Sequence, residues 1–114
     1  MSEEKRKYKR VDIELPALYK IAGSSTSLKA TIVNISPEGL RFLSSVEIVI
    51  GVEVDLKVQL EENNNVSLST RVVWAEYLQE KKQYGNGVKI INVDDEDEQR
   101  FIKFYCQKVL MDTP

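Results

Sequence analysis

Apolar and polar residues alternate without a break over residues 52–60, and this alternation is the feature that most limits how the chain can fold. The apolar positions are Val52, Val54, Leu56, Val58 and Leu60, and the positions between them are Glu53, Asp55, Lys57 and Gln59. Side chains two residues apart lie on the same face of a β-strand. Such a segment therefore predicts a strand with one face in a core and the other in water.

The same period of two recurs in three other segments, residues 11–21, 28–32 and 66–74, and residues 84–91 are expected to form the last strand. Pro16 in the first segment indicates an edge or a bend, because proline donates no ladder hydrogen bond. Trp74 continues the alternation of its segment and is expected in the core. A short apolar pair, Leu40 and Phe42, follows the turn at residues 37–39. Polar loops separate strands in hairpin order, which predicts a closed antiparallel barrel or a sandwich.

The C-terminal part of the chain has a helical period instead. Apolar residues recur there at three- and four-residue spacing, namely Phe101, Ile102, Tyr105, Cys106, Val109 and Leu110. Asp94 is a suitable N-cap, and the acidic residues 95–98 interact favourably with a helix N-terminus. We therefore expect one amphipathic helix over about residues 94–111, packed on the strands with Cys106 on its buried face.

The composition argues against catalysis. The 114 residues, a usual length for one domain, include no histidine, which is the common general base near neutral pH and the commonest metal ligand. No phosphate-binding glycine loop is present. The acidic residues 94–98 lack the spacing and the glycine of a calcium loop. We expect no enzyme, no metal site and no cofactor.

The sequence also predicts a cytoplasmic protein. It has no run of eighteen apolar residues, so we expect no membrane insertion. The basic N-terminus is followed by no apolar stretch, so it does not resemble a secretory signal. The single cysteine, Cys106, suits a reducing compartment.

Charge is distributed unevenly along the chain. The net charge is −2, which argues against a general binder of DNA or RNA. The N-terminus nevertheless carries a basic cluster of Lys5, Arg6, Lys7, Lys9 and Arg10. A local basic cluster on an acidic protein favours a small anionic ligand over a long nucleic acid.

Two short motifs carry the most specific information. The first is Arg6-x-x-x-Arg10, just before the first strand, and the second is Asn34-x-Ser36-x-x-Gly39, at the end of the second strand. Each alone is also common as a solubilising cluster or a turn. In this order on a β-rich chain they resemble the signature of the PilZ domain family, Arg-x-x-x-Arg followed by Asp/Asn-x-Ser-x-x-Gly. Residues 71–74 and 84–90 are similar to that family's last two strands.

The resemblance implies a fold and a ligand. The fold is a six-stranded antiparallel β-barrel of the split-barrel type with a C-terminal helix, here over residues 11–114, preceded by a flexible basic arm over residues 1–10. The usual ligand is cyclic di-GMP. The motifs assign ligand binding to Arg6, Arg10, Asn34, Ser36 and Gly39, with Lys5, Lys9 and Arg41 as additional candidates.

The chemistry of that ligand suits these residue types. An arginine guanidinium donates two parallel hydrogen bonds to guanine O6 and N7 or to phosphate oxygens. The Asn34 amide oxygen can accept from a guanine N–H, and the Ser36 hydroxyl can donate to a phosphate or a base. Gly39 can adopt a positive φ and let a ligand approach the backbone. Arg41 adds a possible phosphate contact.

We therefore expect a cyclic di-GMP receptor, a monomer or weak homodimer, in signalling of the kind that controls bacterial motility or biofilm. Ordering of the arm would relay the signal to a still unidentified protein effector. The alternative is a PilZ-like module that binds proteins and no nucleotide. A barrel that binds single-stranded nucleic acid would need an aromatic stacking face, and we expect the aromatic residues here to face mostly the core.

Overall fold

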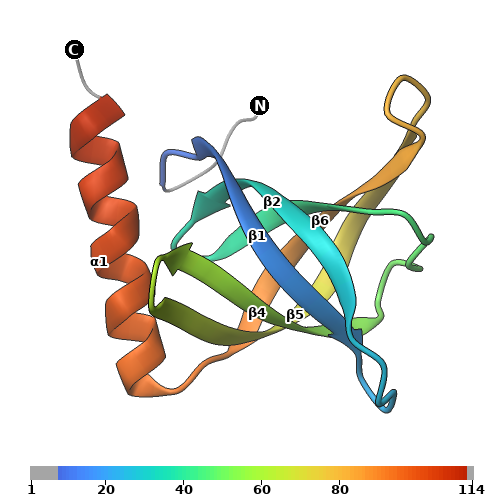
Figure 1. The fold of residues 1–114 in the computed structure, drawn as a ribbon, viewed down its shortest axis with the longest axis horizontal. Coiled ribbons are helices and arrows are strands. Elements are labelled where there is room, and N and C mark those ends of the chain that lie inside the picture. Colours follow the sequence, from blue (N-terminus) through green and yellow to red (C-terminus); the bar gives the residue numbers. More distant parts are fainter. Residues whose placement is uncertain (1–7, 113–114) are drawn as a thin grey trace.

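Six strands and one helix make up the protein (Figure 1). The computed structural model describes residues 8–112. The elements are β1 (Val11–Ile21), β2 (Leu28–Ser36), β3 (Gly39–Ser44), β4 (Glu53–Glu61), β5 (Asn64–Leu78), β6 (Gln83–Asn92) and α1 (Asp95–Asp112). The strands are all antiparallel and close into a barrel in the order β1-β2-β3-β6-β5-β4. The six-stranded barrel with a C-terminal helix is thus confirmed, and the sandwich is not formed.

The barrel interior holds a single apolar core. In β4, buried and exposed side chains alternate along the whole strand, as the sequence pattern predicts. The largest fully buried side chains are Tyr19, Phe42 and Phe101, accompanied by Ile32, Ile35, Leu40, Ile48, Leu56 and Leu68. Pro16 pairs with Thr31 of β2, while the β1–β4 ladder begins only at Ala17. Proline therefore occupies a position where β1 has a neighbour on one side only, as expected.

Bulges interrupt the strict alternation of the longer strands. The register of β5 against β6 shifts between Val72 and Trp74. An inserted residue reverses which side chains face the core, and Trp74 is 41% exposed on the outer surface. The expectation of a core tryptophan was wrong for this reason, since alternation read from sequence cannot locate a bulge.

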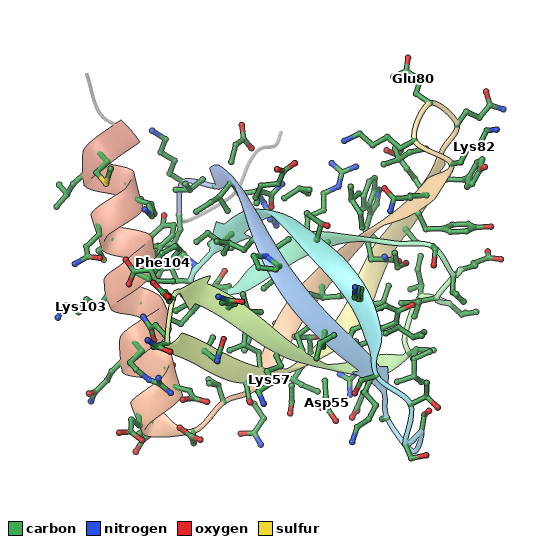
Figure 2. All side chains as sticks on the ribbon, viewed as in Figure 1. Asp55, Lys57, Glu80, Lys82, Lys103 and Phe104 are labelled. Atoms are coloured by element: carbon green, nitrogen blue, oxygen red, sulfur yellow. The ribbon has the colours of Figure 1, made fainter. Side chains whose placement is uncertain are left out.

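Helix α1 stands beside one end of the barrel and packs on β1 and β5 (Figure 1). Phe101, Phe104 and Tyr105 are buried, and Figure 2 shows Phe104 on the barrel side of the helix with Lys103 on the opposite side. Cys106 is exposed and Leu110 is 75% exposed, so their expected burial was wrong. The helix contacts the barrel along a narrower stripe than its apolar residues cover.

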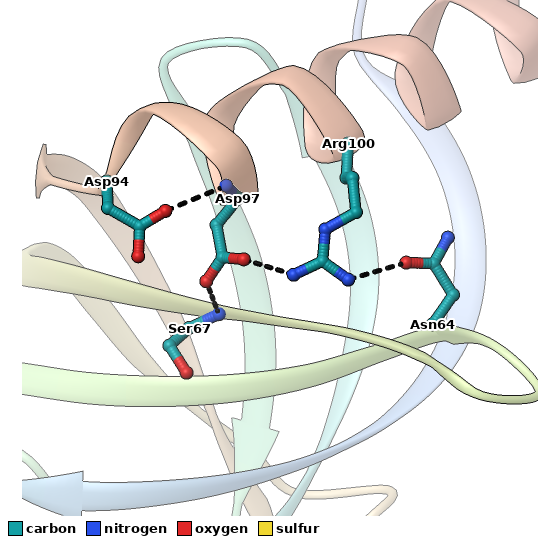
Figure 3. A network of polar contacts seen from close by, with 5 residues as sticks. All are labelled: Asn64, Ser67, Asp94, Asp97 and Arg100. Atoms are coloured by element: carbon teal, nitrogen blue, oxygen red, sulfur yellow. Dashed lines mark hydrogen bonds and ion pairs between the residues drawn. The ribbon is translucent and has the colours of Figure 1, made fainter.

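A polar network fixes the start of α1 on β5 (Figure 3). Asp94 caps the helix, because its Oδ1 accepts from the Asp97 backbone N–H at 2.9 Å. Asp97 itself is buried, and its Oδ2 accepts from the Ser67 N–H at 2.9 Å. Arg100 donates to Asp97 and, at 3.3 Å, to the Asn64 side-chain oxygen. The N-cap predicted at Asp94 is confirmed. Within residues 8–112, no helix has the length and apolarity needed to cross a membrane.

Candidate ligand-binding site

The two sequence motifs meet on the outer surface of the barrel. Arg10 lies directly before β1, and Asn34 lies near the end of β2. The Arg10 Nη1 donates a hydrogen bond of 2.9 Å to the Asn34 Oδ1, in a half-buried setting. The register explains this contact, because Asp12 and Asn34 are partners across the β1–β2 ladder, which puts Arg10 next to Asn34.

Asn34 begins a row of residues that crosses four strands. It lies opposite Arg41 of β3, Arg41 lies opposite Gly87 of β6, and Gly87 lies opposite Trp74 of β5. Directly paired residues point to the same face of a sheet. The row therefore places an amide, a guanidinium and an indole side by side on the outer surface, with a glycine between the last two.

A pocket of about 290 Å³ follows this row. Its walls are Arg10, Asn34, Arg41, Val73, Trp74, Gly87 and Val88. Larger surface hollows of the described residues, of about 650, 590 and 520 Å³, are lined by none of the motif residues. Volume alone favours these hollows, but we assign the candidate site to the smaller pocket because its walls bring an arginine and an amide from the two motifs together.

Arg41 is held in place from two sides. Its Nη2 donates to the Glu76 Oε2 at 3.2 Å, and its Cζ lies 4.5 Å from the centroid of the Trp74 ring. The Arg41 Nε is buried and has no hydrogen-bond partner among residues 8–112. The Arg41 side chain remains 31% exposed, so it is a fixed but accessible part of the pocket wall.

Ser36 and Gly39 shape the turn beside the pocket and do not line it. The buried Ser36 hydroxyl donates to the Gly39 carbonyl oxygen at 3.2 Å. A Cβ on Gly39 would lie 2.3 Å from the carbonyl oxygen of Val88. Gly39 is not among the residues with positive φ, so that expectation was wrong. The glycine is needed here because β3 and β6 approach each other closely.

The predicted basic arm is only partly within the described structure. Lys5 and Arg6 lie outside residues 8–112, so their assignment to the ligand stays a prediction. The Lys9 carbonyl accepts a hydrogen bond from the Tyr105 hydroxyl of α1. Lys9 and Arg10 contact α1 and β2 respectively, and the flexibility of residues 1–10 stays a prediction.

Sequence reasoning missed three contributors to the site, Trp74, Glu76 and Gly87. Trp74 was assigned to the core, and Glu76 has no distinguishing sequence pattern. The spacing of Gly85 and Gly87 inside the last strand was the available signal. Glycine within a strand commonly marks a place where another group approaches the backbone closely.

Comparison with known proteins agrees with this geometry. The protein is a closed six-stranded β-barrel with an arginine directly before β1 and an Asn-x-Ser sequence at the end of β2. The model of the family described as "PilZ domain" matches residues 4–107. The chain therefore belongs to the PilZ domain family.

Solved structures share the fold at low sequence identity. The inhibitor of motility MotI/DgrA of Bacillus subtilis superposes with a TM-score of 0.81 at 15% identity, covering 98% of this chain and 55% of that one. The complex of Klebsiella pneumoniae MrkH with c-di-GMP gives 0.78 at 13% identity, with 95% and 53% coverage. This chain thus spans about half of those proteins. The PilZ domain of Escherichia coli YcgR with c-di-GMP gives 0.67 at 14% identity, with 96% and 100% coverage. No curated protein sequence matches significantly.

Proposed function

We propose that this protein is a receptor for cyclic di-GMP and that the ligand binds in the pocket between Arg10 and Trp74. The observation that carries the proposal is the hydrogen bond of 2.9 Å between Arg10 and Asn34. It places one residue from each motif of the PilZ family in a single pocket. Family membership and the c-di-GMP complexes of MrkH and YcgR support the same ligand.

The pocket offers complementary groups to a guanine nucleotide. The Arg10 guanidinium is suited to guanine O6 and N7 or to a phosphate. In the free protein one of its donors is engaged by Asn34. Binding therefore requires the Arg10–Asn34 contact to open or to be shared, after which Asn34 is available to a guanine N–H. Arg6 and Lys5 of the arm, and Lys9, are further candidates for the phosphates.

The remaining part of the proposal concerns signalling. The protein acts as a receptor and not as an enzyme, works in the cytoplasm as a monomer or weak homodimer, and passes the signal to a protein effector in motility or biofilm control. No DNA or RNA is a ligand. The contacts of Lys9 and Arg10 with α1 and β2 support a relay through the N-terminal arm.

Calorimetric titration with cyclic di-GMP tests the function, and cyclic di-AMP is the matched control ligand. Guanine presents two acceptors, O6 and N7, where adenine presents an N6 amino donor in place of O6. We expect saturable heat at micromolar concentrations with cyclic di-GMP and much weaker binding of cyclic di-AMP. Absence of heat from folded protein at tens of micromolar would overturn the proposal and favour a module that binds proteins only.

A further inference from the structure

Arg41, Trp74 and Glu76 form a unit on the outer face of the barrel that the family motifs do not include. We infer that this unit is a stacking platform for one guanine base of the ligand. The base stacks on one face of the planar Arg41 guanidinium, and Trp74 packs against the other face. Glu76 holds the edge of the guanidinium by a hydrogen bond. This inference rests on the proposed function and specifies how the pocket selects a base.

The platform exists because β6 carries no side chain beneath it. Arg41 on β3 and Trp74 on β5 both lie opposite Gly87 on the intervening β6. A Cβ on Gly87 would lie 3.4 Å from two Trp74 carbons, and one on Gly85 would lie 3.0 Å from the Arg41 Nη2. The contact at Gly85 would be tighter than ordinary packing, and the contact at Gly87 would be at its lower limit. The two glycines therefore leave room for the arginine and the indole to approach β6 closely.

The contacts of Arg41 set the orientation of its guanidinium. The guanidinium carbon lies 4.5 Å from the centroid of the Trp74 ring, within the range of a cation–π contact. A hydrogen bond of 3.2 Å from the Arg41 Nη2 to the Glu76 Oε2 holds that end of the guanidinium. Arg41 is also part of the wall of the pocket that contains Arg10 and Asn34. Trp74 is part of the same wall, so a ligand there meets both side chains.

The charges favour a base over a phosphate at this position. Glu76 places a carboxylate beside the guanidinium, which offsets the positive charge and repels a phosphate nearby. A neutral purine meets no such repulsion. It stacks readily on an arginine plane, as bases commonly do in nucleotide sites. Arg10 and Asn34 of the same pocket then supply the hydrogen bonds to the base edge.

The experiment uses two conservative substitutions with a matched pair as control. Arg41→Lys keeps the charge but removes the planar group, and Glu76→Gln removes the carboxylate charge. Arg71→Lys and Glu53→Gln are the controls, because these two residues form an exposed ion pair of 2.7 Å outside the pocket wall. Affinity for cyclic di-GMP is measured by calorimetry. Trp74 is the only tryptophan of the chain, so its fluorescence reports directly on the platform.

We expect Arg41→Lys to weaken binding of cyclic di-GMP about tenfold, within the range for loss of one stacked base. The change in Trp74 fluorescence on binding should be prominent in the parent and reduced in this variant. Glu76→Gln should weaken binding by a smaller factor, about threefold, because glutamine holds the Arg41 guanidinium less firmly than the carboxylate does. The control variants should bind like the parent.

Two other results would overturn the platform. If Arg41 contacts a phosphate, Arg41→Lys keeps nearly full affinity and Glu76→Gln tightens binding. If the parent protein binds cyclic di-GMP in calorimetry and Trp74 fluorescence does not change, the base lies elsewhere. In both cases the receptor function survives. If the parent, shown to be folded by circular dichroism, binds no cyclic di-GMP, the receptor function and the platform both fall.

Discussion

Arg10 is the residue whose substitution should affect ligand binding most directly. Its guanidinium lies in the pocket and contacts Asn34 of the second motif. We expect Arg10→Ala to lower the affinity for cyclic di-GMP by about 1–3 kcal/mol, or roughly five- to one-hundred-and-fifty-fold, as expected for one lost bidentate contact. Arg10→Lys should restore little of this loss, because the planar fork is missing. Calorimetry measures both.

The barrel provides the control for this substitution. Arg10 lies before β1 and contributes no side chain to the core, so both variants should unfold at nearly the parental urea concentration. Arg71→Ala, on the outer face of β5, should keep parental affinity. Equal binding by Arg10→Ala and the parent would show that the pocket beside Asn34 is not the ligand site.

Gly39 should matter for stability before it matters for binding. An alanine Cβ would lie 2.3 Å from the Val88 carbonyl oxygen, so β3 and β6 would have to separate locally. We expect Gly39→Ala to lower the free energy of unfolding by roughly 1–3 kcal/mol, as for other overpacked sites. Urea denaturation measures it, with exposed Glu38→Ala of the same turn as control. Unchanged stability would mean that the turn adjusts to the added methyl group. The predicted role of Gly39 in ligand binding would then be the better explanation for a glycine at this position.

The two motifs singled out a pair of residues whose role in ligand binding stays a prediction. Arg10 and Asn34 were identified from their spacing, and the structure brings their side chains together. Trp74 was misplaced because the bulge after Val72 depends on how β5 pairs with β6. Cys106 was misplaced because the width of a helix contact depends on the surface it meets. Both errors concern tertiary pairing, which local periodicity does not contain.

At the level of elements, the start of α1 is held by a buried carboxylate. The Ser67 backbone N–H holds the pKa of the Asp97 carboxyl below its usual value, burial opposes this effect, and Arg100 adds to the lowering. A depressed pKa in the folded state means that the contribution to stability is fully present above the unfolded value of about 3.9. It is lost as the pH falls through the folded pKa.

Asp97→Asn should therefore destabilise the protein in a pH-dependent way. At pH 7 we expect a loss of about 1.5–3 kcal/mol, the usual value for a hydrogen bond to a charged group. The difference from the parent should shrink as the pH falls below about 4, where the unfolded carboxyl becomes protonated, and should be lost once the pH passes the lower pKa of the folded protein. Urea midpoints between pH 2 and 7 measure this. Asp95→Asn, exposed in the same turn, is the control, and a pH-independent difference would contradict the assignment.

The elements themselves followed closely from the sequence. The alternation of residues 52–60 and 11–21 located β4 and β1 within one residue, because each strand has one face in the barrel core. Predicted ends were poorer for β2 and β5, which continue beyond the periodic segments to Ser36 and Leu78. The extension of β2 carries a bulge and Asn34 of the pocket, and a bulge of β5 lies just before Trp74, at the end of its periodic segment. The candidate site therefore lies where the simple pattern fails.

At the scale of the whole molecule, a hydrogen bond joins the helix to the residue that precedes Arg10 of the candidate pocket. The Tyr105 hydroxyl of α1 donates to the Lys9 carbonyl, and the next residue, Arg10, reaches into the pocket. Burial raises the pKa of Tyr105, so the hydroxyl stays protonated and able to donate at neutral pH. Because coupling between two sites is reciprocal, ligand binding at Arg10 should stabilise the docking of α1, and docking of α1 should hold Arg10 ready for the ligand.

Tyr105→Phe tests this coupling, because it removes the hydroxyl and keeps the buried ring. We expect about fivefold weaker binding of cyclic di-GMP, corresponding to about 1 kcal/mol for one hydrogen bond that preorganises the arm. In hydrogen exchange, saturating ligand should slow the amides of α1 in the parent but not in the variant, while those of β4 should change in neither. If the two proteins bind with equal affinity, and ligand changes the exchange of the α1 amides in neither, the helix is not coupled to the site. The signal would then leave the barrel through the arm alone.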